Sequence, residues 1–102
     1  ALRLHAPEAP RAQVADANYW LGEALFQLKR YRDSAEAFLT VSDDFPNAVK
    51  APEALLRLGQ TLAALGENET ACASLGHLLT KYPKASASVK RAVEQEQKRV
   101  RC

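Results

Sequence analysis

Two stretches of sequence decide the fold: ANYWLGEALFQL at residues 17–28 and ALLRLGQTLAAL at residues 54–65. A shift of 37 residues superposes them, so that Leu21, Gly22 and Leu25 coincide with the residues at 58, 59 and 62. The same shift superposes a second pair of stretches, DFPNA at residues 44–48 and KYPKA at residues 81–85. Because both ends of the unit match at one offset, the chain contains an internal repeat.

Each repeated unit contains two helical patterns. In the first unit, leucines at positions 21, 25 and 28 follow helical spacing, and KRYR at residues 29–32 interrupts the stripe. A second apolar pattern then continues to Pro46, and its counterpart in the next unit continues to Pro83. Asn47 is predicted to cap the following helix, which would place Pro52 near its fifth position and distort its first turn.

The sequence therefore predicts an all-α fold, an α-solenoid of antiparallel helix hairpins with a C-terminal capping helix. Sustained alternation of apolar and polar residues, the signature of strands, is absent. We expect one domain over residues 1–102, divided into the tail of a preceding repeat (1–10), two repeats (11–46 and 47–83) and a capping helix (84–102). The first residues, ALRLHAPEAP, lack an initiator methionine, so we expect the chain to be a piece of a longer protein.

The repeated glycines predict where the helices of each hairpin approach most closely. A glycine inside a helix costs about 0.5–1 kcal/mol relative to alanine, so the local packing should require the missing side chain. We expect Gly22 to lie against the helix that carries Phe38, and Leu21 and Leu25 to be buried in the same hairpin. The predicted structural positions of the repeat are Leu21, Gly22, Phe38, Pro46, Leu58, Gly59, Ala71, Leu75 and Pro83.

Composition and charge exclude several classes of protein. Of the 102 residues, 47% are hydrophobic and 25% charged, a balance typical of a globular domain and not of a disordered one. No apolar run reaches the length of about 18–20 residues that a membrane span needs. Residues 81–102 hold seven basic and two acidic groups (+5), and the other residues hold seven basic and ten acidic groups (−3). This basic segment is either a solvated terminal helix or a surface for an anionic partner.

The chain offers little material for catalysis or for metal binding. His5 and His77 are isolated from other ligand-type residues, and the pair Asp43 and Asp44 is interpreted as a solvated helix end. The four glycines follow the repeat pattern and form no phosphate-binding loop. We therefore expect no catalytic residue, no metal, no cofactor and no nucleic-acid partner.

Cys72 and Cys102 leave two alternatives open. An oxidising compartment would favour a disulfide between them. The other interpretation is a small buried side chain at position 72 and a free thiol at the terminus. Straight antiparallel helices would carry the last residue about 12 Å beyond Cys72, so a bond requires the chain end to fold back.

The repeated residues resemble the tetratricopeptide family. Its pattern contains an L-G pair, which is present here at Leu21-Gly22 and at Leu58-Gly59. The F position of the pattern is occupied by Phe38 in the first repeat and by Leu75 in the second, and the P position by the two prolines. Within that family, YWLGE at residues 19–23 and KAPEALLRLG at residues 50–59 resemble the YbgF/CpoB family, periplasmic cell-division coordinators associated with the Tol–Pal system. YPKASASVKRA at residues 82–92 and the final RVRC agree with this likeness.

This resemblance implies a binding surface on the first helix of each hairpin. In such stacks these helices line a groove that holds a peptide or a helix of a partner. Tyr19 and Phe26 are seven residues apart on one helix face and would form an aromatic platform, unless one of them belongs to the core. The residues predicted to line the groove are Asp16, Tyr19, Glu23, Phe26, Gln27, Glu53, Leu56, Arg57, Gln60 and Ala63.

The resemblance also implies a function and a place. It predicts a non-enzymatic periplasmic module that binds TolA and helps to coordinate septal peptidoglycan synthesis with outer-membrane constriction, with a peptidoglycan synthase complex as a further partner. The alternative is a scaffold of an outer-membrane assembly or peptidoglycan-associated complex, with the basic cap touching anionic polymer. We expect this fragment to be monomeric or weakly self-associating, and the full-length protein to be a trimer through an upstream coiled coil.

Overall fold

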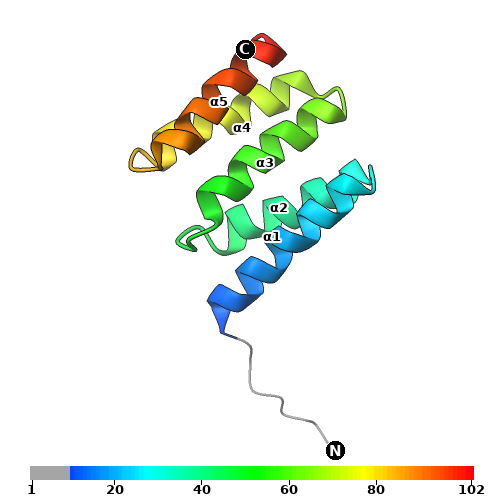
Figure 1. The fold of residues 1–102 in the computed structure, drawn as a ribbon, viewed down its shortest axis with the longest axis vertical. Coiled ribbons are helices and arrows are strands. Elements are labelled where there is room, and N and C mark those ends of the chain that lie inside the picture. The colour runs from blue at the N-terminus through cyan, green and yellow to red at the C-terminus, as the bar shows by residue number, and fades with distance from the viewer. Residues whose placement is uncertain (1–9) are drawn as a thin grey trace, which may run out of the picture.

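A computed structural model describes residues 10–102 as five α-helices (Figure 1). The helices are α1 (Arg11–Gln27), α2 (Tyr31–Asp44), α3 (Ala51–Ala64), α4 (Asn68–Lys81) and α5 (Ala87–Val100). The described residues contain no strand, and the fold is the predicted all-α solenoid. The tail of a preceding repeat and His5 lie outside the described residues, apart from Pro10.

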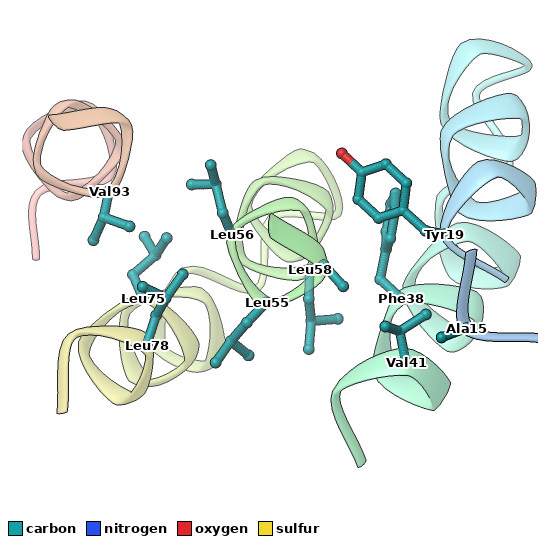
Figure 2. Packing of buried hydrophobic residues seen from close by; sticks show 11 residues of the cluster. Ala15, Tyr19, Phe38, Val41, Leu55, Leu56, Leu58, Leu75, Leu78 and Val93 are labelled. Carbon is teal, nitrogen blue, oxygen red and sulfur yellow. The ribbon is translucent and has the colours of Figure 1, made fainter. Parts of the chain in front are cut away.

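The helices pack as two antiparallel hairpins, α1–α2 and α3–α4, followed by α5 (Figure 1). Viewed along the helix axes in Figure 2, α1, α3 and α5 form one row and α2 and α4 form a second row. The core lies between the rows and contains side chains from every helix, including Phe38 of α2, Leu75 of α4 and Val93 of α5, all fully buried. A single continuous core therefore joins the two hairpins and the last helix.

Both repeat glycines lie at close helix contacts. A Cβ atom added to Gly22 would stand 2.6 Å from Cε1 of Phe38, and one added to Gly59 would stand 2.7 Å from Cδ2 of Leu75. The hydroxyl of Ser34 donates a hydrogen bond of 2.7 Å to the carbonyl oxygen of Gly22 at the same crossing. This is the close contact between the two helices of a hairpin that the sequence predicts.

The start of α3 differs from the prediction at Asn47 and Pro52. The helix begins at Ala51 and its N-cap position is Lys50, so Asn47 does not cap it. Pro52 consequently occupies the first turn, where a backbone N–H has no partner within the helix and its loss costs nothing. The expected distortion is avoided because residues 45–50 form a longer link between the hairpins.

The turn inside each hairpin contains one residue with a positive φ angle. It is Lys29 in the first hairpin (φ 63°) and Gly66 in the second (φ 80°), again 37 residues apart. This left-handed conformation is open to glycine and costs other residues about 1–2 kcal/mol. The first hairpin therefore contains a strained lysine where the second has a relaxed glycine.

Leu21 is not buried, contrary to the prediction. It is 51% exposed, whereas its counterpart Leu58 is 5% exposed and faces α2 (Figure 2). The reason is positional: α2 covers this side of α3, and no described helix covers the same side of α1. Leu28 is exposed for the same reason.

The C-terminal helix is capped at its start and bonded to α4 at its end. Ser86 caps α5, accepting a hydrogen bond from the backbone N–H of Val89. At the other end of α5, Arg101 adopts a left-handed conformation (φ 67°). A disulfide joins Cys72 to Cys102 with the two Cα atoms 5.5 Å apart. The disulfide thus answers the question that the sequence leaves open, and the backbone N–H of Cys102 donates a hydrogen bond of 2.8 Å to the carbonyl oxygen of Gln97.

Candidate protein-binding face

The candidate site is the surface formed by α1, α3 and α5, here called the α1/α3/α5 face. Eight of the ten residues predicted to bind a partner have side chains that are at least partly accessible. Asp16 and Gln27 are exposed. Those that are half-buried are Glu23, Phe26, Glu53, Arg57, Gln60 and Ala63.

Tyr19 and Leu56 are core residues, so their predicted exposure is wrong. Tyr19 is 3% exposed and Leu56 is 7% exposed. Figure 2 shows the ring of Tyr19 between α1 and α3, where it meets the ring of Phe38 edge to face at 5.6 Å. The 37-residue shift relates Tyr19 to Leu56 and then to Val93, which is fully buried. The sequence could have indicated this, because a repeat position that is apolar in all three places is expected to lie in the core.

An ion pair connects the two repeats across this face. The Nε of Arg57 on α3 lies 3.3 Å from Oε1 of Glu23 on α1, and its Nη1 donates a hydrogen bond of 3.0 Å to Oε1 of Gln60. Burial alone would lower the pKa of Arg57, but its contacts with Tyr19 and Glu23 outweigh burial and raise the pKa. The guanidinium therefore remains charged and holds three predicted residues together.

An exposed aromatic cluster lies beside this ion pair and was not predicted. Trp20 is 56% exposed, and its ring meets that of Tyr19 edge to face at 5.1 Å. The Nζ of Lys50 stands 4.8 Å from the centre of the Trp20 ring and 4.9 Å from that of Tyr19, within the range of cation–π attraction. The sequence indicates this exposure, because the 37-residue shift relates Trp20 to Arg57, and a charged residue at the equivalent position is expected to face outward.

The remaining predicted residues lie around this cluster without forming one platform. The ring of Phe26 packs edge to face against Tyr31 at 5.1 Å, near the turn between α1 and α2. The Oε1 of Glu53 lies 3.8 Å from the ammonium of Lys50. Phe26 is thus engaged within its own hairpin, and the exposed aromatic surface is the indole of Trp20.

Within residues 10–102 the structure contains no group of three or more histidine, cysteine or acidic side chains able to hold a metal ion. His77 is exposed on α4, on the opposite row of helices. In the same part of the chain, no helix is both long and apolar enough to cross a membrane.

The comparison with known families agrees with this geometry. The tetratricopeptide repeat family model matches residues 16–48 and again residues 53–85. The chain belongs to the tetratricopeptide repeat family. Domains of this family are typically non-catalytic modules for protein–protein interaction. No curated protein matches the chain with significant sequence similarity.

Proposed function

We propose that this tetratricopeptide domain binds a segment of a partner protein on the α1/α3/α5 face, and that the partner is TolA in the periplasm. The observation that carries the proposal is the half-exposed indole of Trp20 next to the ammonium of Lys50 and the Glu23–Arg57 ion pair. These groups belong to both repeats, so a bound segment crosses from α1 to α3.

The chemistry of the cluster supports a protein ligand. Tryptophan and arginine are the residue types that contribute most often and most strongly to protein–protein affinity. The ring of Trp20 offers an apolar surface that is already fixed against Tyr19, so that little rotational freedom is lost on binding. Charged side chains at its edge, Lys50 and Arg57 above all, select partners with an acidic or amide group beside the apolar residue.

The resemblance to the YbgF/CpoB family supports the finer assignment. YWLGE and KAPEALLRLG, the stretches that carry the resemblance, also contain Trp20, Lys50 and Arg57 of the cluster. The Cys72–Cys102 disulfide is compatible with an oxidising compartment such as the periplasm. In this role the domain helps to coordinate septal peptidoglycan synthesis with outer-membrane constriction.

Titration calorimetry with the periplasmic part of TolA tests the proposal. Trp20→Ala should weaken binding at least tenfold, because it removes the largest exposed apolar group of the face. Leu39→Ala is the matched control, since Leu39 is an exposed apolar residue on α2, in the other row. Equal affinity of the wild type and Trp20→Ala would exclude the α1/α3/α5 face, and no binding by the wild type would exclude TolA.

A second candidate function is a scaffold that touches anionic polymer through the C-terminal helix. Its support is the exposed basic residues Lys84, Arg91, Lys98 and Arg101 on and around α5. Sedimentation with isolated peptidoglycan would distinguish the two functions. Polymer binding through α5 should disappear at high salt and in the double variant Arg91→Glu with Lys98→Glu, whereas Trp20→Ala should not affect it.

A further inference from the structure

Helix α5 buries fewer of its residues than any other described helix. Only Val93 and Glu96 of its 14 residues are buried, whereas α3, which has the same length, buries seven. Val89 and Ala92 add partly buried contacts with the core. A helix of about 12–15 residues is only marginally stable by itself in water, so α5 depends on this small contact and on any other link to its neighbours.

One of the two buried side chains, Glu96, weakens the attachment of α5. Its side chain is only 10% exposed, and its carboxylate pairs with Arg99 of the same helix. The pair therefore does not join α5 to another helix, while burial of the carboxylate still costs free energy. The apolar attachment rests chiefly on Val93, which points from α5 toward Leu75 of α4 (Figure 2).

The disulfide is the remaining link between α5 and its neighbours. Within residues 10–102, no hydrogen bond or ion pair joins α5 to another helix, because its side-chain bonds reach only its own residues and the loop before it. By contrast, Ser34 bonds α2 to α1, and Arg57 joins α3 to α1. The bond between Cys72 and Cys102 spans a separation of 30 residues and ties the end of α5 to α4.

This disulfide is accessible to a reductant. Cys102 is exposed, and Cys72 is half-buried on α4. A thiolate of an external dithiol attacks the sulfur of Cys102, which forms a mixed disulfide and releases the sulfur of Cys72 as a thiolate that takes up a proton. The second thiol of the reductant then attacks the mixed disulfide and releases Cys102. The protein gains two electrons and two protons, and the dithiol becomes a disulfide.

We propose that the Cys72–Cys102 bond is a redox latch for α5. In the oxidised domain α5 covers the end of the core next to Leu75. After reduction by a dithiol, α5 leaves α3 and α4 and loses its helical structure, while α1–α4 keep theirs. The Trp20 cluster lies on α1 and at the start of α3, so this inference does not rest on the proposed partner or binding face.

NMR spectroscopy of the isotope-labelled domain with and without dithiothreitol tests the latch. Reduction should move the amide signals of residues 87–100 to random-coil positions and speed their hydrogen exchange at least about a hundredfold, the effect expected from opening a loop of this size. The indole signal of Trp20 and the amides of α1 and α2 should keep their positions. Native α5 signals in the reduced domain would overturn the proposal, and so would loss of the native signals of every helix.

Variants distinguish the latch from other effects of the reductant. Cys72→Ser with Cys102→Ser should show the released α5 without reductant, and dithiothreitol should change nothing further. Glu96→Leu should keep α5 docked after reduction, because it replaces a buried carboxylate by an apolar side chain of similar size. Glu94→Leu, at an exposed position of the same helix, is the matched control and should not do so. Release of α5 in reduced Glu96→Leu to the same extent as in the reduced wild type would also overturn the proposal.

Discussion

Substitution of Gly22 by alanine should destabilise the domain, although alanine is the better helix former. The added Cβ would stand 2.6–2.8 Å from three carbons of the Phe38 ring, and Phe38 is fully buried. The ring or the whole of α2 must move by several tenths of an ångström to restore van der Waals contact. Overpacking of this kind costs about 1–3 kcal/mol, and the helix propensity of alanine returns about 1 kcal/mol.

The net change in the free energy of unfolding depends on how easily the side chains at this contact can move. Because the clash involves a fully buried aromatic ring, the cost should lie in the upper part of its range, which leaves a net loss of about 1–2 kcal/mol. For a domain of this size that loss lowers the melting temperature by roughly 4–16 °C. Gly59→Ala should behave alike, since its Cβ would stand 2.7 Å from Leu75.

Gly76 provides the internal control for this reasoning. It lies within α4, and a Cβ added there meets no atom within 4 Å. Gly76→Ala should therefore stabilise the domain by about 0.5–1 kcal/mol through propensity alone. Chemical denaturation of the three variants measures the differences. If Gly22→Ala were as stable as Gly76→Ala, the close contact with Phe38 would not govern the packing of the hairpin.

Three further predictions concern the C-terminus, a turn and a tyrosine. Cys72→Ser with Cys102→Ser should cost about 3–4 kcal/mol in the chain-entropy model for a separation of 30 residues; unchanged denaturation midpoints would show that the bond does not stabilise the cap. Lys29→Gly should raise the free energy of unfolding by about 1 kcal/mol because it relaxes a positive φ angle, and a lower melting temperature would refute this. Burial raises the pKa of Tyr82, whose hydroxyl donates a hydrogen bond of 2.7 Å to the carbonyl oxygen of Pro46. A raised pKa contributes stability that is complete below about pH 10 and is lost as the pH rises through the folded-state value. Tyr82→Phe should therefore be less stable than the wild type by about 1 kcal/mol at pH 7, and this difference should shrink above pH 10 in urea titrations; a constant difference would contradict it.

The internal repeat made most of the fold predictable. Leu21-Gly22 and Leu58-Gly59 identified the hairpins, and Gly22 and Gly59 indicated the helix crossings. The start of α3 was missed at Pro52, because local capping rules cannot tell how long a link the stacking of two hairpins requires. Leu21 was missed because a similar sequence context does not show whether a neighbouring helix covers the residue: α2 lies over Leu58 of α3, and no described helix lies over Leu21 of α1.

The binding face was predicted less well than the fold. The prediction treated Tyr19 as free and overlooked Trp20, because helical spacing alone does not show which of two adjacent aromatic residues faces the neighbouring hairpin. Comparison of equivalent positions in the two repeats distinguishes them, because the equivalent of Tyr19 is the apolar residue Leu56, whereas the equivalent of Trp20 is the charged residue Arg57. The disulfide was left open because helix lengths counted from the sequence give only the position of Cys102 along a straight helix, and not how α5 lies on α4.

The central claim is that a partner binds across α1 and α3 at Trp20. The most direct measurement is an NMR titration of the isotope-labelled domain with the periplasmic part of TolA. Trp20 is the only tryptophan, so its indole N–H gives one assignable signal. We predict that this signal shifts or broadens together with the backbone amides around Glu23 and Arg57, while amides on the outward side of α2 and α4 keep their positions. Changes confined to α2 and α4, with an unmoved indole signal, would contradict the account.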